Sequence, residues 1–114
     1  FRRVLELRTE DAIARLHVGL VHLRRGEWHD AVEVLTVAAR EPDARVAVFH
    51  NLAYAHERLE QWDAAAARLD EAARRGGADD PQVTLSRAVL ALKQGRLPEA
   101  MDLLTAARER WGGR

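Results

Sequence analysis

The side chains best suited to chemistry are five histidines, which share the chain with eighteen acidic residues and no cysteine. The histidines are His17, His22, His29, His50 and His56. No two of them stand at the i, i+4 spacing that places two metal ligands on one face of a helix. The sequence also lacks a glycine-rich phosphate-binding loop, and the absence of cysteine excludes thiol catalysis and Cys-based zinc sites. We therefore expect a protein that is not an enzyme and holds no cofactor or metal.

The elements that carry these histidines recur along the chain. One landmark appears three times, as Gly26-Glu27-Trp28, Glu60-Gln61-Trp62 and Gly95-Arg96-Leu97, in steps of 34 and 35 residues. A fixed period near 34 residues indicates a repeat array, in which each unit contacts only its neighbours. His22 and His56 occupy the same repeat position, where we expect them to replace a core aromatic residue.

Small residues and leucines recur with the same period. The equivalent sets are Gly19, Ala53 and Ala88; Ala31, Ala65 and Ala100; Leu35, Leu69 and Leu104; and Ala38, Ala72 and Ala107. Small side chains let two antiparallel helices approach closely, while Trp28, Trp62 and Leu97 fill the space at the turn between them.

This pattern resembles the tetratricopeptide repeat, a helix-turn-helix unit of about 34 residues. The resemblance implies an all-α fold, a right-handed superhelical array of antiparallel helix pairs. It covers nearly the whole chain, with repeats at 12–45, 46–80 and 81–114 and the end of a preceding repeat at 1–11. Because the chain begins within a repeat and without Met, we expect a fragment of a longer protein.

The helical periodicity, together with capping residues, prolines and glycines, predicts seven helices, at 1–8, 11–25, 28–40, 44–59, 62–75, 81–94 and 97–111. Thr9 is the expected N-cap of the second helix. Pro42 should stop the third, and Gly76-Gly77 supplies a left-handed turn. Asp80-Pro81 and Pro98 should begin the last two helices, because proline fits the first turn of a helix.

Charge and composition restrict the partners. Eighteen basic and eighteen acidic residues cancel, so the long-range field that non-specific nucleic-acid binding needs is missing. The sequence contains no apolar run of about 20 residues, so we expect no membrane insertion. Arg outnumbers Lys 17 to 1, as is typical of a GC-rich bacterial genome. The composition fits both cytoplasm and periplasm, and we favour the cytoplasm.

The resemblance implies that the first helix of each pair lines a concave surface that holds a peptide or a partner's helix. A helical wheel places two apolar stripes and a polar centre on this face. The face comprises Ile13, Leu16, Leu20 and Leu23 in the first repeat, Ala47, His50, Tyr54 and Glu57 in the second, and Gln82, Leu85, Val89 and Leu92 in the third. Asn51 in the second repeat is also a candidate groove residue. The stripes could instead pack against neighbouring repeats, against other parts of a longer parent protein, or against a second copy.

A basic column follows the same face. Arg24, Arg58 and Lys93 stand 34 and 35 residues apart and could hold a carboxylate or an acidic segment of a bound peptide. The alternative is that they only favour the C-terminal ends of their helices. A clamp for a chaperone's C-terminus, known in the family, is disfavoured because Leu16, Leu20 and Leu85 occupy the polar sites that it requires.

We therefore predict a non-catalytic scaffold that binds a protein or peptide in its concave groove. Two alternatives stay open. The chain could self-associate as a homo-oligomer through its helix ends, with Phe1, Val4 and Leu5 at one end and Trp111 at the other. It could also be a regulatory or substrate-recruiting segment of a larger enzyme or signalling protein.

Overall fold

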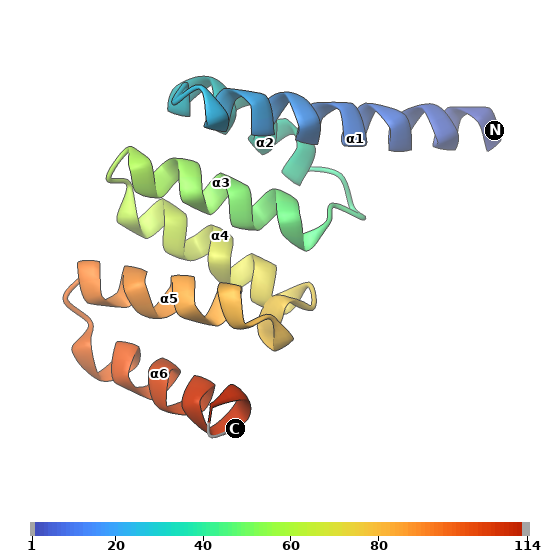
Figure 1. Cartoon of the computed structure of the whole chain (residues 1–114). Helices are drawn as coiled ribbons and strands as arrows, with labels where there is room; N and C mark the ends of the chain where they lie inside the picture. The colour runs from blue at the N-terminus through green and yellow to red at the C-terminus, as the bar shows by residue number, and fades with distance from the viewer. Residues whose placement is uncertain (1, 113–114) are drawn as a thin grey trace.

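The computed structural model describes residues 2–112, with side chains from residue 13 onward. Within this range the chain forms six α-helices and one short 3-10 helix, and no strand. The helices are α1 (Arg2–Arg24), α2 (Trp28–Ala39), α3 (Val46–Arg58), α4 (Trp62–Arg74), η1 (Gly77–Asp79), α5 (Pro81–Lys93) and α6 (Leu97–Trp111). They stack as three antiparallel pairs in an elongated body of 47 × 28 × 22 Å (Figure 1). The predicted all-α array of helix pairs is confirmed.

The turn inside each pair has the same backbone structure in all three repeats. Its first landmark residue has a positive φ, at 73° for Gly26, 59° for Glu60 and 75° for Gly95. The next backbone N–H donates to the carbonyl five residues earlier, over 2.9 Å in repeat one and 2.8 Å in the other two. The landmark therefore recurs because each repeat needs one left-handed residue to reverse its chain.

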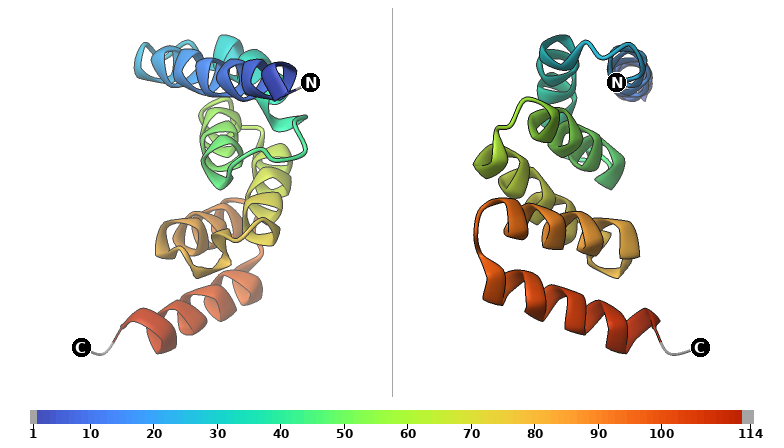
Figure 2. Two further views of the ribbon diagram at one scale, coloured as in Figure 1. Left: turned by 90° about the vertical axis from the view of Figure 1, so that its right-hand side faces the viewer. Right: turned by 60° about the vertical axis from the view of Figure 1, so that its left-hand side comes forward.

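Close packing explains the columns of small residues. Leu35 and Leu69 are fully covered, as are the alanines at the 31 and 65 positions. A Cβ added to Gly19 would lie 2.5 Å from a methyl group of Leu35, so α1 requires glycine at this point. The second helix of each pair also packs on the first helix of the next pair, which continues the stack (Figure 2).

The predicted connections between the pairs are largely confirmed. Pro42 lies in the loop after α2, and Gly76 adopts the left-handed conformation with φ 106°. Asp80 caps α5 by accepting a hydrogen bond of 2.9 Å from the Gln82 N–H, and Pro81 occupies the first turn. Pro98 likewise lies in the first turn of α6.

The helix break predicted at Thr9 is wrong. A single helix of 23 residues, α1, replaces the two expected at 1–8 and 11–25. The loops between the later pairs contain Pro42 or Gly76-Gly77, whereas the stretch 7–11 has neither proline nor glycine. Threonine is tolerated inside a helix, so no residue in this stretch forces a turn.

Candidate peptide-binding groove

A pocket of about 390 Å³ lies between α3 and α5, the first helices of the second and third repeats. We call it the α3/α5 pocket. Its lining consists of His50, Asn51, Ala53, Tyr54, Glu57, Leu69, Gln82 and Ser86. Of the residues predicted for this face, His50, Tyr54, Glu57 and Gln82 lie in the lining together with Asn51, whereas Ala47 does not. Their spacing explains this, because positions 50, 54 and 57 follow one face of a helix.

Polar contacts join α3 to α5 on both sides of Tyr54. His50 Nε2 lies 3.3 Å from the Ser86 hydroxyl oxygen, and the Lys93 ammonium lies 3.7 Å from the Glu57 carboxylate. Asn51 donates its amide N–H to the Ala47 carbonyl 2.8 Å away on its own helix, so that group is already satisfied. The half-exposed tyrosine is left between these contacts with a surface open to a ligand.

Three apolar side chains are exposed on α5, the helix that supplies Gln82 and Ser86 to the pocket lining, but they are not part of that lining. Leu85, Val89 and Leu92 are all exposed and follow one another at the i, i+4, i+7 spacing of a helical stripe. This part of the expected apolar surface is present. Ser86 was not among the predicted site residues; its position four residues after Gln82 on α5 is the signal that could have found it.

The other expected stripe is not an open surface. Leu23 is buried, and Leu16 and Leu20 are partly buried against the cluster formed with Leu35 and Leu52. Of the four residues, only Ile13 is exposed. The expectation of an exposed first wall is therefore wrong, because Leu16, Leu20 and Leu23 pack against the cluster that joins the first two repeats. Leu85, Val89 and Leu92 hold the same repeat positions but stay exposed, since no repeat follows theirs within the described residues. Their polar equivalents, such as His50 and Glu57, stay at the surface of the pocket.

Two of the three residues in the basic column, Arg58 and Lys93, stack on the tryptophan of the preceding repeat. The Arg58 guanidinium lies 5.3 Å from the centre of the Trp28 ring, and the Lys93 ammonium lies 4.8 Å from that of Trp62. Tyr54 also meets Trp28 edge-on, with ring centres 5.9 Å apart. Arg58 and Lys93 therefore contribute to packing between repeats, a role that sequence reasoning did not foresee.

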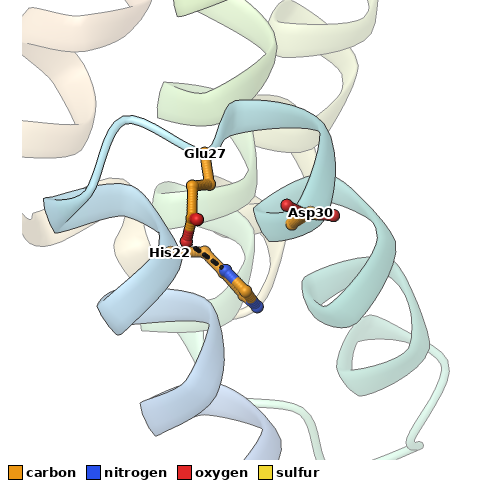
Figure 3. Close-up of side chains that lie close together, drawn as sticks. All are labelled: His22, Glu27 and Asp30. Carbon is orange, nitrogen blue, oxygen red and sulfur yellow. Dashed lines mark hydrogen bonds and ion pairs between the residues drawn. The ribbon is translucent and has the colours of Figure 1, made fainter.

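A group of potential metal ligands lies at the first turn. His22, Glu27 and Asp30 each offer one potential ligand atom, and these three atoms lie within 4.8 Å of one another. His22 Nδ1 donates a hydrogen bond of 2.8 Å to the Glu27 carboxylate (Figure 3). In the second repeat, His56 makes the same bond to the Gln61 amide oxygen over 2.7 Å. Because a neutral amide replaces the carboxylate without changing the geometry, the bond is a feature of the turn. Neither histidine is the core residue expected from the sequence.

Some predicted contacts of the chain ends cannot be compared with the structure. Phe1 and the side chains of Val4 and Leu5 lie outside the described residues. Trp111 is half-buried, and the Arg110 guanidinium lies 5.3 Å from its ring centre. None of the helices in the described range combines the length and hydrophobicity that a membrane span requires.

The helical hairpin stack and its recurring turn define a class, the α-helical repeat proteins. The sequence model of the tetratricopeptide repeat family matches residues 1–45 and 50–114. The chain belongs to the tetratricopeptide repeat family. Among curated proteins, no significant match is found.

Solved structures with the same fold include two peptide complexes. The type III secretion chaperone SycD of Yersinia enterocolitica, in complex with a peptide of the translocator YopD, shares 20% identity at a TM-score of 0.80; the match covers 89% of this chain and 76% of SycD. The second tetratricopeptide domain of Spaghetti (RPAP3), bound to the HSP90 peptide SRMEEVD, shares 19% identity at a TM-score of 0.83, with 96% of both chains covered.

Proposed function

We propose that this chain is a non-catalytic protein-interaction module that binds a peptide or amphipathic helix of a partner in the α3/α5 pocket and along α5. The observation that carries the proposal is the polar pocket, together with the exposed stripe Leu85, Val89 and Leu92 on α5, the helix that supplies Gln82 and Ser86 to the pocket lining. Apolar side chains exposed in a row on one helix gain free energy when a ligand covers them. The family supports this role, since two of the similar structures hold a peptide.

The chemistry of the pocket suggests how such a ligand is oriented. The apolar side of the ligand would lie on the α5 stripe, where it removes Val89 and its neighbours from water. Tyr54 presents a hydroxyl that can donate to a peptide carbonyl, and the Gln82 amide can both donate and accept. The ligand is therefore an amphipathic segment whose polar edge runs along α3.

A displayed library of random peptides tests the proposal without knowledge of the natural partner. Peptides selected on the chain should bind Val89→Asp at least about tenfold more weakly, because the new carboxylate is desolvated without a partner. Tyr54→Ala should also weaken them. Val21→Asp is the matched control, since Val21 is an exposed valine on the first helix of another repeat.

Two outcomes contradict the proposal. Selection could yield no peptide that binds the chain, or the selected peptides could bind Val89→Asp and Tyr54→Ala as well as they bind the unchanged chain. Circular dichroism of each variant establishes that the helices are intact, which is expected because both side chains lie at the surface.

A further inference from the structure

The α3/α5 pocket has one acidic side chain in its lining, that of Glu57. No arginine or lysine of the described residues belongs to this lining. The pocket is built by two adjoining repeats, the second and the third, so both of its walls are present in the structure. Its charge therefore favours a cationic group of a ligand over an anionic one.

Two cations of the basic column lie on the same helices as the pocket but contact aromatic rings. The Arg58 guanidinium lies on the Trp28 ring, and the Lys93 ammonium lies on the Trp62 ring. Lys93 approaches the partly exposed Glu57 carboxylate only to 3.7 Å, which is longer than the about 2.7–2.9 Å of a charge-assisted hydrogen bond. The carboxylate thus keeps acceptor capacity for a donor that a ligand supplies.

The neutral part of the lining suits the stem and the head of a long cationic side chain. The Asn51 amide N–H is used by the Ala47 carbonyl, which leaves the side-chain oxygen of Asn51 as an acceptor. Tyr54 is 46% exposed and offers an aromatic ring that attracts a cation. Ala53 and Leu69 add apolar surface for an aliphatic stem.

We infer that the α3/α5 pocket selects a basic side chain of the bound peptide, arginine in preference to lysine, an inference that rests on the proposed function. The guanidinium of the ligand replaces Lys93 as the partner of Glu57 and lies against Tyr54. Arginine is preferred because its planar fork donates two hydrogen bonds to one carboxylate and stacks on aromatic rings. This is the reverse of the sequence-based expectation that the basic column holds a carboxylate of the ligand.

Peptides selected on the chain from a displayed random library measure the preference directly. They should be enriched in arginine at one position. Synthetic peptides in which citrulline replaces this arginine should bind at least about tenfold more weakly, because citrulline has a similar shape but no charge. Lysine at this position should bind about two- to fivefold more weakly than arginine.

Glu57→Gln tests whether this carboxylate is the origin of the preference. The variant should bind the arginine peptide no more tightly than the citrulline peptide, whereas its affinity for the citrulline peptide should stay close to that of the unchanged chain. A purely structural role of Glu57 would weaken both peptides equally. Glu33→Gln is the matched control, since Glu33 is an exposed glutamate on α2, outside the pocket.

Lys93→Met tests the exchange of partners in the opposite direction. It removes the cation that competes for Glu57 but keeps an unbranched apolar side chain beside Trp62. The arginine peptide should bind this variant about two- to fivefold more tightly, which corresponds to the free energy of an exposed ion pair. Unchanged or weaker binding would contradict the replacement of Lys93 by the ligand.

Three further results overturn the inference: the selected peptides are not enriched in basic residues, citrulline binds as tightly as arginine, or Glu57→Gln weakens both peptides equally. Circular dichroism of Glu57→Gln and Lys93→Met establishes that the helices are intact. Peptides that depend on Val89 and Tyr54 but lack a basic residue would remove this inference and leave the proposed function standing. A library that yields no binding peptide contradicts both.

Discussion

The guanidinium of Arg58 lies 5.3 Å from the centre of the Trp28 ring, so the second repeat places a cation on the aromatic turn residue of the first. The interface between the second and third repeats has the same arrangement, with the Lys93 ammonium 4.8 Å from the centre of the Trp62 ring. The stacking recurs because both the cation and the aromatic ring occur at the same position of successive repeats. It is a contact between repeats, whereas the turn hydrogen bonds lie within one repeat.

A double-mutant cycle on Arg58 and Trp28 measures this contact. Arg58→Gln and Trp28→Leu, singly and together, should reveal a coupling free energy of about 0.5–1 kcal/mol, the range for exposed cation–π pairs. Urea denaturation of the four proteins gives the value. A coupling near zero would mean that the two groups contribute only through separate burial.

Leu35, Leu69 and Leu104 share one repeat position but differ in burial, so they should differ in how much each contributes to the free energy of unfolding. Leu35→Ala and Leu69→Ala should each lower the free energy of unfolding by about 2–5 kcal/mol through lost burial and a residual cavity. Leu104→Ala should cost less than about 1.5 kcal/mol, because its side chain already meets water. Chemical denaturation of the monomer at low concentration provides the comparison. Equal losses at all three positions would contradict the burial described for α6.

Glu60 is the one residue other than glycine with a positive φ in the described range, at 59°. A Cβ in this left-handed conformation costs about 1–2 kcal/mol. Glu60→Gly removes that cost and adds freedom to the unfolded chain, so stability should rise by up to about 1 kcal/mol. The reciprocal variant Gly26→Glu should be destabilised. Thermal unfolding measures both, and a loss of stability in Glu60→Gly would contradict the strain.

Glu71 links the pH dependence of stability to the C-terminal end of α4. Hydrogen bonds from Arg74 and then Arg75 hold the pKa of Glu71 below its usual range. A carboxyl whose pKa is lower in the folded state stabilises the fold above its unfolded pKa, and loses that contribution as pH falls through the folded pKa. The Arg75 guanidinium also donates to the Pro42 and Ala44 carbonyls, over 3.0 and 3.2 Å, so the carboxylate helps to position that link.

Thermal unfolding of the unchanged chain and of Glu71→Gln should therefore differ at neutral pH, with the unchanged chain more stable. The difference should shrink as the pH is lowered through the depressed pKa of Glu71, below the usual range for glutamate, because the carboxylate then becomes protonated. Asp70→Asn is the control, as Asp70 is the adjacent carboxylate and pairs instead with Arg87 at 3.4 Å. A constant difference between the unchanged chain and Glu71→Gln across this range would assign the effect to something other than the charge of Glu71.

The period was sufficient to predict the helix pairs, because the residues that recur are the ones that packing and chain reversal require. Gly26 and Gly95 mark left-handed turns, and Ala31 and Ala65 mark close helix contacts. The uninterrupted course of α1 through Thr9 was not predictable in this way. A capping residue shows where a helix can begin, but without glycine or proline nearby it does not force one to end.

The pocket was only partly predictable for a similar reason. The helical wheel correctly grouped His50, Tyr54 and Glu57 on the face that lines it. It also placed Leu16 and Leu20 at the equivalent positions, but it does not give the depth to which a side chain sinks. Leu16 and Leu20 pack against the second repeat, whereas Leu85 and Val89 at the same positions have no following repeat within the described residues and stay exposed.

Each helix pair contacts the next through one interface, and this arrangement also determines which part of the molecule unfolds first. Local unfolding of the last pair, α5 and α6, breaks only its interface with α4, whereas the middle pair α3 and α4 contacts a neighbouring pair on both sides. Amide protons of α6 should therefore exchange with deuterium faster than those of α4. Mechanical tension along the long axis would unzip the pairs one after another, so the chain would yield in steps.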